Sequence, residues 1–187
     1  MPGVRASTAQ SNRARTGETR IAKLYLATAR ETIERHLPRI VSCLGELGEQ
    51  QIWWRPNSAS NSAGNLTLHL CGNIRQWIIS GLGGAPDVRT RDAEFAERGP
   101  LPRRVLVRRL RKTVREALGI VRRLLPSALT RRYVIQSFRV TGLYAIFHVA
   151  EHFSHHAAQI IYITKMKRAR DLRFTALRTS SKRIDRI

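Results

Sequence analysis

The sequence contains few cysteines, few aromatic residues and few acidic residues. Its two cysteines, Cys43 and Cys71, belong to no CxxC pair, which argues against a disulfide framework and favours a reduced, cytoplasmic setting. Aromatic residues make up 6% of the 187 residues, which disfavours a β-sandwich with an aromatic core. No apolar run approaches the ~20 residues that a membrane span needs. Residues 1–20 contain no hydrophobic block, so we expect neither a signal peptide nor a membrane protein.

Acidic residues are outnumbered by basic ones, 13 against 34, and the net charge is +21. The excess lies in residues 1–20, 99–140 and 165–187, whereas the remainder is balanced and contains all six histidines. A strong positive charge indicates an anionic partner such as nucleic acid, or simply a solvated helix face with basic tails. We favour the second interpretation because no nucleic-acid recognition motif accompanies the charge.

Four segments repeat apolar residues every three or four positions, a pattern typical of amphipathic helices. The expected helices cover residues 22–47, 62–80, 104–124 and 141–167. Pro38 lies within the first of them and should kink it or break it. Residues 133–135, just before the last helix, predict a brief extended piece.

These helices predict an all-α protein that folds as a four-helix bundle. We place the bundle at residues 20–167, with a basic flexible N-terminal tail at residues 1–19 and a basic C-terminal tail at residues 168–187. The polar connection between the second and third helices is long enough to cross one end of the bundle, or to run its length.

Three histidines fall on the faces of these helices that should point inward. His152 and His156 are four residues apart, so their imidazoles project from one face about one turn apart. His69 lies on the inward face of the second helix, between Asn65 and Asn73. Three imidazoles from two helices suit a divalent metal ion such as Zn, Ni, Fe or Mn, and leave coordination positions open. The alternative is a set of buried histidines that are hydrogen-bonded to polar neighbours.

Other motifs for chemistry are absent. The sequence contains no glycine-rich phosphate loop, no GxSxG elbow and no HExxH motif. The acidic residues of the long connection, Asp87, Asp92 and Glu94, lie among arginines, and we expect them to be solvated.

Four motifs together resemble the DinB-like family of YfiT-type bundles, in a bacterial branch known as a domain of unknown function. The motifs are QIWWRPN at residues 51–57, GNLTLHLCGN at 64–73, RTRDAEF at 89–95 and HVAEHFSHHAAQIIY at 148–162. The resemblance implies an up-down-down-up bundle with a long crossover between helices 2 and 3, often assembled as a homodimer. It also implies a divalent metal ion held by His69, His152 and His156. We expect Asn65, Asn73, His148 and Gln159 to line the pocket or to orient the ligands.

Characterised members of this family include thiol S-transferases and isomerases that use mycothiol, bacillithiol or glutathione. The resemblance therefore implies a metal-dependent thiol S-transferase or isomerase that acts on a small-molecule substrate, with a low-molecular-weight thiol as cofactor. Two alternatives remain open. One is a non-catalytic dimeric helical bundle. The other is a basic protein that binds nucleic acid through its arginine-rich third helix and its tails.

Overall fold

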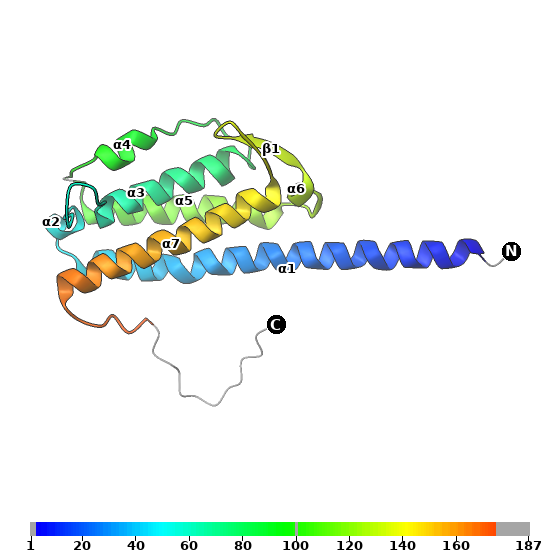
Figure 1. Ribbon diagram of the computed structural model, residues 1–187, viewed down its shortest axis with the longest axis horizontal. Helices are drawn as coiled ribbons and strands as arrows, with labels where there is room; N and C mark the ends of the chain where they lie inside the picture. The colour runs from blue at the N-terminus through cyan, green and yellow to red at the C-terminus, as the bar shows by residue number, and fades with distance from the viewer. Residues whose placement is uncertain (1–2, 100, 175–187) are drawn as a thin grey trace, which may run out of the picture.

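The structure is a computed structural model that describes residues 3–99 and 101–174. Four long helical segments lie side by side along a common direction (Figure 1). They are α1 (Gly3–Glu46), α3 (Ala63–Ile74) with its π-helical continuation η1 (Arg75–Ser80), α5 (Arg103–Arg123) and α7 (Gly142–Arg168). Both α1 and α3 pack against α5 and α7, so the four segments enclose one core.

Short elements connect these helices. They are α2 (Glu49–Ile52), α4 (Arg91–Ala96), α6 (Ser127–Thr130) and the antiparallel strands β1 (Arg132–Ile135) and β2 (Phe138–Thr141). Gln136 and Ser137 have positive φ angles of 52° and 66°, as a tight hairpin turn requires. Strand β1 confirms the extended piece expected at residues 133–135.

The connection between η1 and α5 runs back along α3 and carries α4 with it (Figure 1). The polar connection therefore spans the length of the bundle. This path matters for function because it places α4 against α3.

Two of the long helices, α3 and α7, begin directly after a residue that caps the helix N-terminus. The Ser62 side chain accepts a hydrogen bond from the Asn65 backbone N–H, and Thr141 does the same for Tyr144. Both caps stand where the sequence predicted the second and fourth helices to begin. The second helix continues to Ser80, but its last six residues adopt the π-helical form.

Of the two outcomes expected at Pro38, a break is wrong, because α1 continues as one helix through that residue. Proline removes a single backbone donor from the ladder. The apolar face of α1 is buried on both sides of it, at Ile33 before the proline and at Ile40 and Leu44 after it. Packing against the other helices stabilises the helix on both sides of the proline.

Helix α1 begins at Gly3, so it includes residues 3–19, for which the sequence predicted a flexible tail. At the other end, α7 stops at Arg168, and Ala169 takes a left-handed conformation with a φ of 49°. The sequence predicted a C-terminal tail at residues 168–187, of which residues 175–187 lie outside the described part. None of the helices in the described part is long and apolar enough to cross a membrane.

Candidate metal centre

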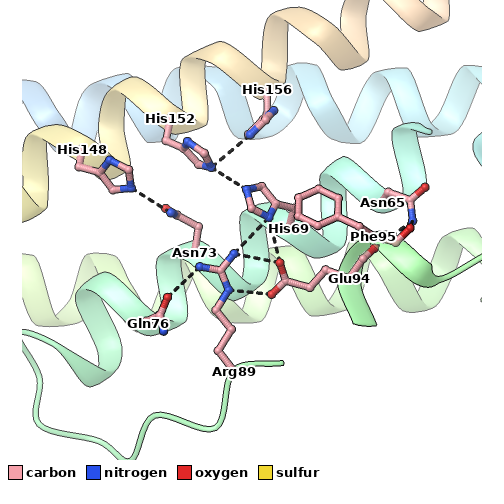
Figure 2. A network of polar contacts seen from close by, with 10 residues as sticks. All are labelled: Asn65, His69, Asn73, Gln76, Arg89, Glu94, Phe95, His148, His152 and His156. Carbon is pink, nitrogen blue, oxygen red and sulfur yellow. Dashed lines mark hydrogen bonds and ion pairs between the residues drawn. The ribbon is translucent and has the colours of Figure 1, made fainter. Parts of the chain in front are cut away.

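Three imidazoles meet in the middle of the bundle. His69 comes from α3, whereas His152 and His156 come from α7 (Figure 2). The Nε2 atom of His152 lies 2.9 Å from Nε2 of His69 and 3.1 Å from Nε2 of His156. Ligand atoms of the three residues all lie within 4.8 Å of one another. The structure thus brings together the three histidines that the sequence singled out.

The hydrogen bonds behind two of these rings fix which nitrogen carries the proton. Nδ1 of His69 lies 2.9 Å from a Glu94 carboxylate oxygen, and Nδ1 of His156 lies 2.6 Å from the Gln159 amide oxygen. Both acceptors require an N–H at Nδ1, so the neutral form of each ring has its lone pair on Nε2. We assign these tautomers from the hydrogen bonds. Two lone pairs therefore face the Nε2 atom of His152 from either side.

Glu94 and Arg89 form a buried ion pair beneath His69. The guanidinium donates to both Glu94 oxygens, from Nε at 2.8 Å and from Nη2 at 2.9 Å, and both side chains are less than one-tenth exposed. Nη2 also lies 3.1 Å from His69 Nδ1. Since arginine has no acceptor and an ionised carboxylate has no donor, the Nδ1 proton bonds to Glu94, not to Arg89.

Helix α4 lies close to α3 because α3 has a glycine, Gly72, where the two helices meet. A Cβ atom on Gly72 would overlap the Glu94 carboxylate and press on the Arg89 side chain. The buried amide of Asn65 donates to the backbone carbonyls of Glu94 and Glu97, at 2.9 Å each. These contacts hold α4 so that its carboxylate reaches His69.

The other residues expected around the site take different places. Gln159 contacts His156 directly, as described above. His148 lies next to His152 on α7, with ring centroids 5.2 Å apart, and its Nε2 is 3.0 Å from the Asn73 amide nitrogen. Asn65 fixes the backbone of α4 from behind Phe95 (Figure 2). Two of the expected residues, Gln159 and His148, thus contact histidines of this group, whereas Asn73 contacts His148.

The expectation that the acidic residues of the long connection are solvated is wrong for Glu94, which is 8% exposed. Asp87 also has a partner, since it accepts a hydrogen bond of 2.7 Å from Gln76. Glu94 and Arg89 were not among the site residues predicted from the sequence. The available signal was their position at residues 89–95, one of the four motifs that carry the family resemblance.

The chemistry of this donor set fits a divalent cation. Ligand nitrogens at 2.0–2.1 Å from a tetrahedral zinc ion lie roughly 3.3 Å apart, close to the separations found here. A histidine ligand commonly donates its second N–H to a carboxylate or an amide, which fixes the ring and raises its basicity. Glu94 and Gln159 supply such partners. Three protein ligands leave a fourth position for another molecule.

Burial favours the neutral form of the two histidines on α7. It lowers the pKa of His152 to about 3, with a further contribution from His156 and His69, and it lowers the pKa of His156 to about 4. Burial alone would raise the pKa of Glu94, but hydrogen bonds from Arg89 and His69 outweigh it and hold that pKa below its usual value. At neutral pH the His152 and His156 rings are thus unprotonated, and Glu94 is ionised.

These shifts predict that the metal-free protein loses stability in mild acid. A histidine in an unfolded chain titrates near pH 6.5, whereas folded His152 and His156 stay neutral down to about pH 4 or below. Below pH 6.5 the unfolded state therefore binds more protons than the folded state. The free energy of unfolding falls as a result. Urea unfolding in a chelator at pH 7.5, 5.5 and 4.5 should show a falling midpoint. A midpoint that stays constant over this range would contradict the assignment.

The sequence matches one protein family, and the fold is similar to solved structures. The family model of DUF1572, described as a protein of unknown function, matches residues 20–180. None of the curated proteins matches the sequence. Two solved structures are similar. A conserved protein from Enterococcus faecalis has 14% identity and a TM-score of 0.67, over 77% of this chain and 97% of its own. A DinB-like protein from Bacillus cereus has 14% identity and a TM-score of 0.55, over 72% and 87%.

At these identities the two structures show the fold alone. They agree with the DinB-like bundle that the sequence resemblance predicted. The family match covers most of the chain, so this protein belongs to the DUF1572 family.

Proposed function

We propose that this DUF1572 protein binds one divalent metal ion through His69, His152 and His156, and uses it in a thiol transfer reaction. The observation that carries the proposal is the convergence of three Nε2 atoms, two of them with a lone pair assigned by their hydrogen bonds. An ion at this site supplies a Lewis acid that lowers the pKa of a thiol.

The protein's own residues prepare the ligands for this role. Glu94 holds the His69 ring through Nδ1, and Gln159 holds the His156 ring in the same way. The Phe95 ring packs on His69 with centroids 4.6 Å apart, which limits water on that side. Pre-oriented ligands need no rearrangement when the ion binds, and this favours affinity.

Polar atoms beside the histidines support a small-molecule substrate there. The Oδ1 atom of Asn73 and the Nε1 atom of Trp77 are both buried without a hydrogen-bond partner among the described residues. His148 contacts both side chains, with its ring 4.1 Å from the Trp77 ring. Buried polar groups normally have hydrogen-bond partners. These two atoms therefore suit a molecule that donates a hydrogen bond to Asn73 Oδ1 and accepts one from Trp77 Nε1.

The thiol must come from outside the protein. Cys43 is fully buried, and burial raises the pKa of its thiol. Burial also raises the pKa of Cys71 to about 12, and its side chain faces Thr113 of α5. Because a thiolate is the reactive form, neither cysteine provides a nucleophile near neutral pH. A low-molecular-weight thiol is the remaining source.

A transfer assay tests this function. Protein loaded with Zn, Ni, Fe or Mn is mixed with mycothiol, bacillithiol or glutathione and 1-chloro-2,4-dinitrobenzene. The thiol sulfur forms a bond to the ring carbon, chloride leaves with the carbon–chlorine electron pair, and the thiol proton goes to solvent. We expect a protein-dependent increase in rate that disappears with chelator or without thiol. A metal-loaded protein that accelerates none of these reactions would favour the alternative, a non-catalytic bundle with a structural ion.

The resemblance also supports two finer features. We propose that the bundle has the up-down-down-up topology of the DinB type, and the path of the connection back along α3 supports this. We further propose that the chain assembles as a homodimer, in keeping with the family.

A further inference from the structure

Helix α5 carries a dense row of arginines and lysine on its outer surface. The side chains of seven basic residues of α5 have no hydrogen bond or ion pair to any residue in the described part of the chain: Arg104, Arg108, Arg109, Arg111, Lys112, Arg115 and Arg123. All seven are exposed. We call this set the α5 basic face. The helix carries one acidic residue, Glu116.

Structural roles account for the other two cations of α5. Arg122 forms an ion pair of 2.9 Å with Glu34 of α1. The Arg103 side chain donates to the Gly45 and Leu47 carbonyls at the end of α1. Two cations thus fasten α5 to its neighbour, whereas the α5 basic face makes no such contacts. Seven like charges on one helix repel one another, which costs stability unless a partner neutralises them.

The spacing of these charges suits a phosphate backbone. Arg104, Arg108, Arg111 and Arg115 follow one another at three or four positions, so they stand about 5.4 Å apart along the helix. A helix of 21 residues is roughly 31 Å long. Over such a length a DNA duplex carries about nine phosphates on each strand, at 3.4 Å of axis apiece. The helix can therefore pair several arginines with phosphates at once.

The apolar side of α5 argues against a membrane as the partner. An interfacial helix inserts its apolar face between lipids. On α5 that face is buried in the core at Leu106, Leu110 and Val114. Among the described residues, no exposed large apolar side chain lies between residues 103 and 123. Helix α5 therefore exposes positive charge but no apolar surface that could insert into a membrane. This suits a soluble polyanion as its partner.

We propose that the α5 basic face binds the phosphate backbone of double-stranded nucleic acid without sequence preference. From the charge pattern alone, a solvated helix face with basic tails was the favoured interpretation. The unpaired arginines, their turn-by-turn spacing and the buried apolar face now favour it. The face is separate from the metal centre, because α5 packs against α1, α3 and η1, whereas two of the three ligands lie on α7.

Fluorescence anisotropy with a labelled 20-base-pair DNA duplex tests the proposal on the full chain. Wild type is compared with the triple variant Arg108→Gln, Arg111→Gln, Arg115→Gln between 50 and 200 mM NaCl. We expect wild-type affinity to fall steeply with salt. The triple variant should bind at least about tenfold more weakly and lose roughly 2.7 from the slope of log affinity against log salt, since three phosphate contacts are removed.

The matched control is Arg20→Gln, Lys23→Gln, Arg35→Gln, which removes three exposed cations from α1. It keeps the α5 basic face, so its affinity and slope should stay close to those of wild type. Circular dichroism and zinc binding verify that each variant is folded. Three results would overturn the proposal: no wild-type binding at 50 mM NaCl, equal losses in both variants, or binding to phosphatidylglycerol vesicles but not to DNA.

Discussion

Replacing His152 by alanine is expected to abolish the stabilisation that zinc gives to this protein. A ligand at a thousand times its dissociation constant stabilises the folded state by about 4 kcal/mol. For a domain of this size that raises the melting temperature by roughly 8–16 °C. His152 lies between the other two histidines and contacts both of them. Its loss leaves two ligands from different helices, and we expect the shift to vanish.

Differential scanning calorimetry in chelator and in excess zinc measures this effect. The matched control is His155→Ala, since His155 lies on the same helix but is exposed and outside the three-histidine group. That variant should keep the wild-type shift. An equal zinc-induced shift in wild type and His152→Ala would mean that the ion binds elsewhere.

The second large effect concerns Glu94, whose carboxylate contacts Nδ1 of His69, one of the three proposed metal ligands. Replacing it by glutamine removes the negative charge that holds the Nδ1 proton of His69, and breaks the buried pair with Arg89. Loss of such a partner typically weakens metal affinity by about 10- to 100-fold. Competition with a chromogenic zinc chelator measures the dissociation constant. Asp92→Asn is the matched control, because Asp92 is an exposed acid on the same short helix.

A second variant tests the position of the Glu94 carboxylate without replacing Glu94 itself. Gly72→Ala leaves Glu94 in the sequence but places a methyl group where the carboxylate lies, so α4 must move away from α3. We expect it to weaken zinc binding to a similar degree. If folded Glu94→Gln and Gly72→Ala both bind zinc like wild type, Glu94 does not position His69.

The histidine group could be predicted from the sequence because it depends on local periodicity. The four-residue spacing of His152 and His156, and the position of His69 on its own helical stripe, fix the face of each helix. The packing of α3 against α7 then brings the faces together. The family resemblance pointed to the same three residues.

Glu94 and Arg89 could not be predicted in the same way. The contact between Glu94 and His69 joins residues 25 positions apart, across a connection without strong periodicity. It depends on the missing side chain of Gly72 and on the Asn65 amide that binds the α4 backbone. Such contacts follow from tertiary packing. The same holds for Pro38, where packing on both sides of the residue overrides a local rule.

The most direct test of the account is the metal content of the purified protein, measured by elemental analysis beside His152→Ala. The account predicts close to one divalent ion per wild-type chain, either as purified or after incubation with Zn, Ni, Fe or Mn, and none in the variant. The absence of any bound ion from wild type under all of these conditions would contradict it. The three histidines would then be buried polar residues that bond to one another and to their neighbours.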